Sequence, residues 1–212
     1  MVLLLVLQLQ AAAQSLLINE FVYNPDGSDD GLEWIEVCNS SSSAIDIDGW
    51  RIENAGSSWS EVYVMGSEIV EPGGYVLVGF GSASQPGSFS PNLQNGGSSS
   101  DGLRLVDATG LVVDTVLYDS PNSNGLADDT GSTEASTAPA AGSGSSIGRS
   151  PDCSDSDDAA SDFASYGTPS PGEANTGEDD GDGGSDTCVI GSVVINEFMA
   201  NPAGTDAGQE WI

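Results

Sequence analysis

Short apolar runs separated by turn residues are the feature that most constrains the fold of this chain. Glu36-Val37-Cys38 and Asp46-Ile47-Asp48 alternate polar with apolar side chains, as strands with one buried face do. Turn residues such as Asn24-Pro25-Asp26-Gly27 separate the runs, and no convincing helical period interrupts them. About seven short strands at close spacing predict an all-β sandwich. The predicted strands are Leu16–Phe21, Leu32–Asn39, Trp50–Asn54, Glu61–Met65, Gly74–Phe80, Gly102–Val106 and Leu111–Tyr118.

The apolar positions of these runs predict one core, and the remaining sequence predicts loops. Residues 120–145 are rich in Ser, Gly, Ala and Thr and are predicted to form a long surface loop. The predicted core residues are Trp34, Ile35, Val37, Trp50, Ile52, Val76, Val78, Leu103, Leu105, Val113 and Val116.

The charge of the chain excludes several classes of function. Three Arg, no Lys and 33 acidic residues give a formal net charge of −30, and there is no His. Nucleic-acid affinity comes largely from Lys and Arg, so we predict no nucleic-acid partner. Without His and Lys, a Ser-His-Asp triad, a His-ligated zinc site, a P-loop and a Schiff base are impossible. We therefore expect that the chain is not an enzyme.

The N-terminus predicts export. Val2 to Leu9 form a short apolar run, and Ala11-Ala12-Ala13 offers a small-residue cleavage site. Residues 1–13 are predicted to be a signal peptide, with an N-terminal strand as the alternative. The run is shorter than the about 20 apolar residues that a membrane-spanning helix needs, so no membrane span is predicted. The expected location is secreted or cell surface.

An internal repeat divides the chain into domains. Residues 16–35 and 193–212 align without a gap, and 12 of the 20 positions are identical, including the Ile-Asn-Glu-Phe and Glu-Trp-Ile motifs. We predict one sandwich domain over residues 16–172 and an acidic, Gly-rich linker over 173–192. Residues 193–212 are then the truncated start of a second copy, which predicts further repeats or domains of the same chain.

The order and spacing of several motifs resemble the bacterial lamin-tail domain. These motifs are INEF, NPDG, EWIEVCN, AIDIDGWRIEN, PGGYVLVGF and GLRLVDATGLVVDTVLY, followed by SIGRSPD and TPSPGEAN. The resemblance covers residues 16–175 and restarts at residue 193. It implies an immunoglobulin-like β-sandwich, and a module attached to secreted or surface proteins.

Two functions remain open. The first is a non-catalytic binding or spacer module of a secreted or cell-surface protein, with an unidentified protein or surface ligand and a role in adhesion. The alternative is an accessory domain of a secreted hydrolase of the phosphoesterase or nuclease type, whose catalytic part lies outside this sequence.

Acidic residues supply the candidate metal ligands. Calcium prefers such oxygen ligands, and five carboxylates within eleven residues repel one another unless a cation, salt or water screens them. A solvated acidic loop is the alternative, because no fixed ligand pattern is met. No other cofactor is expected. The candidate calcium ligands are Asp152, Asp155, Asp157, Asp158 and Asp162.

Glu20, Glu33 and Glu36 lie on predicted strands and could approach one another. Paired carboxylates of this kind could do acid–base chemistry. Neither a pocket nor substrate-holding aromatic residues accompany them in the sequence. We interpret them as structural or surface residues.

Three cysteines allow three disulfide pairs in an oxidising compartment. Cys38–Cys153 would tie an early strand to the loop after the last predicted strand, and it is the pair we favour. Cys153–Cys188 would bracket the predicted linker, and Cys188 could instead pair outside this sequence. A free, buried Cys38 is the remaining alternative.

Overall fold

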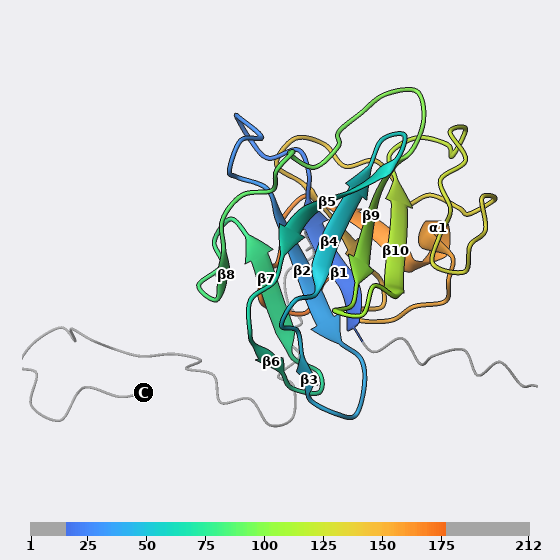
Figure 1. The fold of residues 1–212 in the computed structure, drawn as a ribbon. Coiled ribbons are helices and arrows are strands. Elements are labelled where there is room, and N and C mark those ends of the chain that lie inside the picture. The colour runs from blue at the N-terminus through green and yellow to red at the C-terminus, as the bar shows by residue number, and fades with distance from the viewer. Residues whose placement is uncertain (1–15, 177–212) are drawn as a thin grey trace, which may run out of the picture. The chain divides into compact units, whose positions relative to one another are not determined.

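The fold is a sandwich of two β-sheets (Figure 1). The structure is a computed structural model that describes residues 16–176, so residues 1–13 and 193–212 lie outside the described residues. The larger sheet contains, in spatial order, β12 (Phe163–Tyr166), β11 (Ser146–Arg149), β1 (Leu16–Val22), β2 (Trp34–Asn39), β7 (Tyr75–Gly79) and β8 (Gln85–Pro86). The smaller sheet contains β10 (Val112–Tyr118), β9 (Asp101–Val106), β4 (Arg51–Ala55) and β5 (Trp59–Val64).

The predicted all-β sandwich is confirmed. All seven predicted strands are present, and their neighbours pair antiparallel within the two sheets. The sequence did not reveal β8, β11, β12, the short pair β3 (Ile45–Asp46) and β6 (Ile69–Val70), or the single-turn helix α1 (Ala159–Asp162). Each of these elements has only two to four residues, too few for a period to be recognised.

The inner faces of the two sheets share one hydrophobic core. Ile18 and Phe21 of β1 and Ile35 and Val37 of β2 meet Leu103 of β9 in it. Of the predicted core residues, Val113 alone is only partly buried.

A β-bulge in β1 sets the direction of the INEF side chains. The pairing of β1 with β2 shifts register between Ile18 and Glu20, leaving Asn19 without a cross-strand partner. A bulge lets two consecutive residues face the same side of a sheet. Ile18 and Phe21 therefore enter the core. Asn19 and Glu20 bond to residues on the outer face of the larger sheet.

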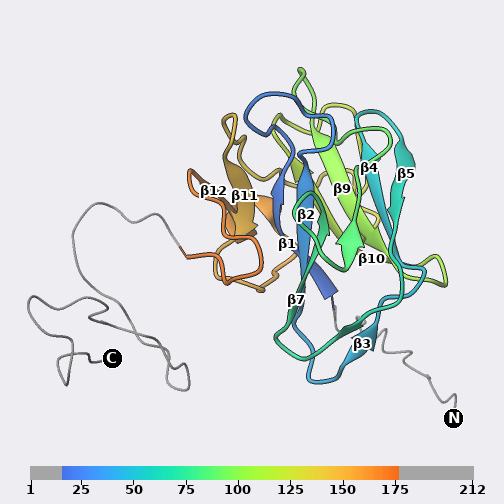
Figure 2. The same cartoon turned by 90° about the vertical axis from the view of Figure 1, so that its left-hand side faces the viewer.

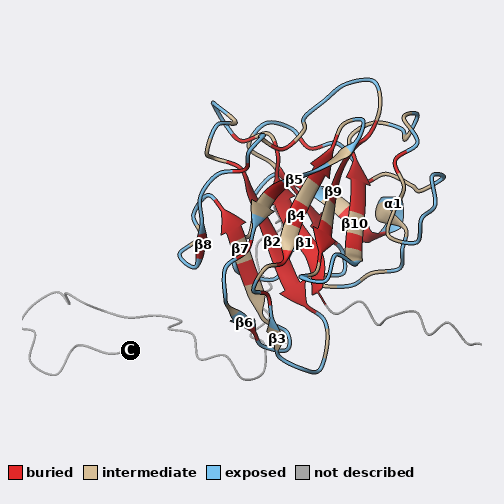
Figure 3. Ribbon diagram, in the orientation of Figure 1, coloured by how far each residue is buried: buried red, intermediate tan, exposed pale blue. Residues whose placement is uncertain are grey.

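That outer face is covered rather than solvated. Every residue of β1 and of β2 is buried, which is visible as continuous red in Figure 3. The loop after β11 and the segment after β12 form the cover, and Figure 2 shows the latter segment, in orange, beside β11 and β1. Strands with both faces covered are buried regardless of alternation, so the expectation of a half-buried strand at Glu36-Val37-Cys38 is wrong.

A disulfide fixes this cover to the sheet. Cys38, at the outer face of β2, is bonded to Cys153 in the loop after β11, with 6.0 Å between the two Cα atoms. This is the pairing that the sequence analysis favours. Glu20 and Glu36 are fully buried beneath the cover, so they are structural rather than surface residues.

The folded unit continues past residue 172. Asn175 is buried, and its side-chain amide donates to the backbone carbonyls of Asn19 and Arg149. The first residues of the predicted linker therefore belong to the sandwich. Within residues 16–176, no helix is long and apolar enough to cross a membrane.

Candidate functional site

Arg149 is the centre of a buried cluster of charged side chains. It ends β11 on the inner face of the larger sheet, and its side chain is 1% exposed. Its guanidinium lies 4.5 Å from the ring centroid of Phe163 and forms ion pairs with three aspartates. These are Asp114 at 3.0 Å, Asp155 at 2.9 Å and Asp162 at 3.6 Å.

The Arg149–Asp114 pair also satisfies the backbone at the β1 bulge. The Ile18 N–H donates to Asp114 Oδ2 at 2.6 Å, and Arg149 Nε donates to the Ile18 carbonyl at 2.8 Å. β11 pairs with β1 at Glu20 and Phe21. The two charged side chains therefore take the place of strand partners at Ile18, where unpaired buried backbone groups would be costly.

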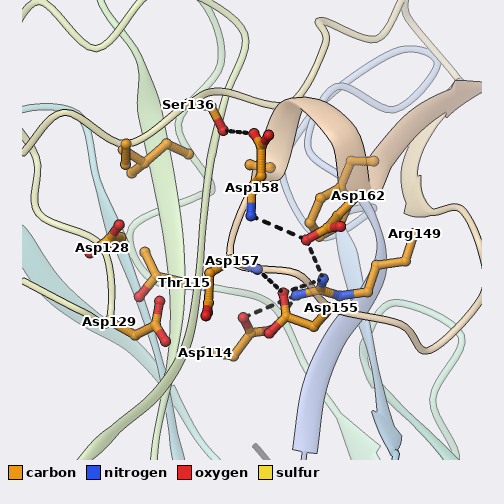
Figure 4. A pocket seen from close by; sticks show the side chains of 14 residues that line it. Asp114, Thr115, Asp128, Asp129, Ser136, Arg149, Asp155, Asp157, Asp158 and Asp162 are labelled. Carbon is orange, nitrogen blue, oxygen red and sulfur yellow. Dashed lines mark hydrogen bonds and ion pairs between the residues drawn. The ribbon is translucent and has the colours of Figure 1, made fainter. Parts of the chain in front are cut away.

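A pocket opens above Arg149, at the edge of the smaller sheet formed by β10 (Figure 4). The loop of residues 120–145 and the segment around α1 supply most of its other walls. One arginine and seven aspartates line it, so the pocket is strongly acidic. The aspartates are Asp114, Asp128, Asp129, Asp155, Asp157, Asp158 and Asp162.

Hydrogen bonds fix several of these carboxylates. Ser136 Oγ and Ser161 Oγ donate to Asp158 and lower the pKa of its carboxyl group. Burial raises the pKa of Asp129 to about 6, and the charge of Asp114 adds to this effect. The pocket therefore contains carboxyl groups with opposite pKa shifts.

The five predicted calcium ligands do not form one group. Asp155, Asp157, Asp158 and Asp162 line the pocket, and two of them are ion-paired with Arg149. Asp152 lies on the outer face of the larger sheet instead, where Tyr75 and Asn19 donate to its carboxylate.

The arrangement offers oxygen acceptors and negative charge to a cation. Thr115 Oγ1 and Asp155 Oδ2 are buried in the pocket lining without a hydrogen-bond partner. Among residues 16–176, however, no three Asp, Glu, His or Cys side chains are arranged so as to hold a metal ion. Arg149 already supplies a positive charge to this cluster. Calcium binding therefore stays a prediction.

Four residues of this site were not predicted from the sequence: Asp114, Asp128, Asp129 and Arg149. Asp114 is 35 positions from Arg149 and belongs to the other sheet. Arg149, one of three Arg in the sequence, was the available signal, since a buried arginine requires acidic partners.

The family comparison fits this architecture. A family model, the Lamin Tail Domain, matches residues 10–120, more than half of the chain. The chain belongs to the lamin tail domain family. This confirms the resemblance drawn from the motifs, and the family is one of non-enzymatic, immunoglobulin-like domains. A comparison with curated proteins gives no match.

The folded unit is larger than the matched region. The match ends after β10, whereas Arg149, Cys153, β11 and β12 lie beyond residue 120. Arg149, Asp155 and Asp162 of the pocket lining therefore come from the flank that follows the matched residues. Asp114 is the member of this ion-pair cluster that lies within the match.

We expect Arg149→Met to lower the free energy of unfolding by about 3–5 kcal/mol, because it leaves Asp114 and Asp155 buried without a counterion. Adding Asp114→Asn should recover part of this loss. Urea denaturation followed by tryptophan fluorescence measures both effects. Arg51→Met is the matched control, since the Arg51–Glu61 pair is partly exposed and should be worth less than about 1 kcal/mol. Equal losses in the two single variants would contradict the assigned role of Arg149.

A second group of buried acids is more weakly satisfied. Glu33 Oε2 accepts from the Leu93 N–H at 3.0 Å, while Glu33 Oε1 and Asp101 Oδ2 are buried without partners. Burial raises the pKa of Glu33 to about 7 and that of Asp101 to about 6. Both carboxyl groups hold a proton more tightly in the fold than in the unfolded chain.

These raised pKa values predict a domain that loses stability as the pH rises. Their contribution is fully present below the unfolded pKa of about 4 and is lost as the pH rises through 6 to 7. We expect the free energy of unfolding, measured by urea denaturation, to fall between pH 4.5 and pH 7.5. Glu33→Gln should reduce that fall by about 1–3 kcal/mol, whereas the exposed Glu134→Gln should leave it nearly unchanged. A wild-type stability that rises over this interval would contradict the assignment.

Proposed function

We propose that this chain is a non-catalytic binding or spacer module of a secreted or cell-surface multi-domain protein, used in protein or surface interaction or adhesion. The observation that carries the proposal is the Cys38–Cys153 bond. Disulfides form and persist in oxidising compartments and are rare where thiols are kept reduced. The apolar start of the chain and its internal repeat favour the same conclusion.

The buried polar face of β1 supports a structural use of the repeated motif. Asn19 bonds to Glu36, Asp152 and the backbone N–H of Cys153, and so joins the sheet to its cover. Asn196 and Glu197 stand at the corresponding positions of the second copy. The repeated residues thus match ones that hold the first domain together, as expected for tandem modules.

The charge distribution argues against duplex DNA as a partner. Arg104 and Arg51 face Glu53 and Glu61 on the smaller sheet, and Arg149 is buried among aspartates. All three arginines are therefore neutralised within the domain, and no Lys is present. A surface of this kind repels phosphate groups and suits a partner with basic or neutral surface groups.

Export and disulfide formation can be tested together by expressing the full chain in a bacterial host with an oxidising periplasm. We expect the protein in the exported fraction, without about its first 13 residues. Non-reducing peptide mapping should recover Cys38 linked to Cys153. Leu4→Arg with Leu5→Arg should block export, because charges interrupt the apolar run. A wild-type protein that stays in the cytoplasm with its start intact, or an exported one with Cys38 free or linked to Cys188, would contradict the proposal.

A further inference from the structure

Three carboxylates meet beneath one short segment on the outer face of the larger sheet. They belong to Glu20 of β1, Glu36 of β2 and Asp152 of the loop after β11, and we call them the carboxylate triad. The segment is residues 168–176, which follow β12, and we call it the strap. Both glutamates are fully buried.

The strap is held to the triad by donated hydrogen bonds. The Ser170 N–H and hydroxyl group donate to Glu20, the Gly172 N–H donates to Glu36 Oε2, and the Asn175 N–H donates to Asp152 Oδ1 at 2.8 Å. Each triad member therefore receives one backbone N–H of the strap.

The triad's remaining partners are polar but carry no positive charge in the described region. Asn19 Nδ2 lies between Glu36 and Asp152, and it donates to both. Ser146 donates to Glu20, and Tyr75 of β7 donates to Asp152 at 2.6 Å. The Arg149 guanidinium is directed to the inner face, toward Asp114.

The strap contains one acidic residue, Glu173, and its side chain is exposed. It therefore adds negative charge near the triad. Within residues 16–176, no arginine is ion-paired with a member of this triad.

We propose that the strap is a pH-sensitive latch, closed over the carboxylate triad at acidic pH and released from it at alkaline pH. When the strap is in place, it keeps water from three neighbouring carboxylates. When the strap opens, water hydrates the three carboxylates. Their negative charges then lie in a medium of higher dielectric constant and repel one another less. Ionisation of Glu36 beneath the closed strap therefore favours the open state.

Glu36 is the group whose ionisation drives the change. It lies in the middle of the sheet, between β1 and β7. Burial raises its pKa to about 7, the bonds from Asn19 and Gly172 oppose this rise, and the charges of Glu20 and Asp152 add to it. When the strap is closed, the Glu36 carboxyl group thus binds a proton. It gives this proton up near neutral pH when the strap is open.

The strap can open without the sandwich unfolding. It pairs with no strand, and Pro171, Gly172, Glu173 and Ala174 are exposed. Segments with few buried apolar contacts open locally at low cost. The sheets beneath keep their ladder bonds and their core.

Release would lengthen the connection to whatever follows the domain. Nine residues in an extended conformation span about 30 Å. This consequence rests on the proposed spacer function, whereas the latch itself does not. The latch would let pH change the distance between successive modules.

Amide hydrogen exchange of the full chain, followed by NMR and corrected for intrinsic rates, tests the latch. Between pH 5.5 and pH 8.5, we expect the protection of the Ser170, Gly172 and Asn175 amides to fall about tenfold or more. The amides of Leu103 and Leu105 in β9 should fall less. Equal protection of the strap at both pH values would overturn the proposal, and it would leave the export experiment unaffected.

Two further measurements identify the group responsible. Glu36→Gln should remove the pH dependence of strap protection, whereas Glu173→Gln, which removes the same charge from the strap's exposed side, should retain it. The carboxyl carbon resonance of Glu36 should titrate with the same midpoint as strap opening. A Glu36→Gln protein with the wild-type pH dependence, or midpoints more than about one pH unit apart, would overturn the proposal.

Discussion

The buried Arg149–Asp114 pair is the interaction on which the rest of the domain depends. The bulge in β1 turns Asn19 and Glu20 toward the outer face, and it leaves the N–H and carbonyl of Ile18 needing partners. Asp114 and Arg149 supply them from β10 and β11, and so join the two sheets at this point. A buried ion pair tolerates loss of one partner poorly, because the remaining charge is uncompensated. Asp155 and Asp162, near α1, belong to the same arrangement, since they share the guanidinium.

The bulge also explains why the domain needs its C-terminal flank. Polar side chains placed on the outer face must find partners if that face is to be buried, and the flank provides them. Cys153 brings the loop after β11 to this face through its bond to Cys38, and Asn175 closes the far end. One sheet is therefore hydrophobic on its inner face and carries a buried polar network on its outer face. The first face holds the sandwich together, and the second binds the C-terminal flank.

Sequence reasoning recovered the parts of this fold that depend on local pattern. The seven strands of five or more residues between Leu16 and Tyr118 contain enough alternating residues to be recognised, and compartment and topology favoured the Cys38–Cys153 pair. The role of Arg149 was not predictable in this way, because its partner Asp114 lies on another sheet. The burial of Glu20 and Glu36 depends on a segment more than 130 residues later in the chain. Because this distant segment was not foreseen, the alternation of polar and apolar residues in β2 indicated one solvated face.

The central claim is that the folded lamin tail domain requires residues 121–176 as well as the region that matches the family model. Comparing urea denaturation and amide NMR dispersion of residues 16–120 with those of residues 16–176 tests it most directly. The longer chain should unfold cooperatively and give a dispersed spectrum. The shorter chain lacks Arg149, Cys153, β11 and the strap. It should give a poorly dispersed amide spectrum and no cooperative unfolding transition in urea. A chain of residues 16–120 that is as stable and as well dispersed as the longer one would contradict the account.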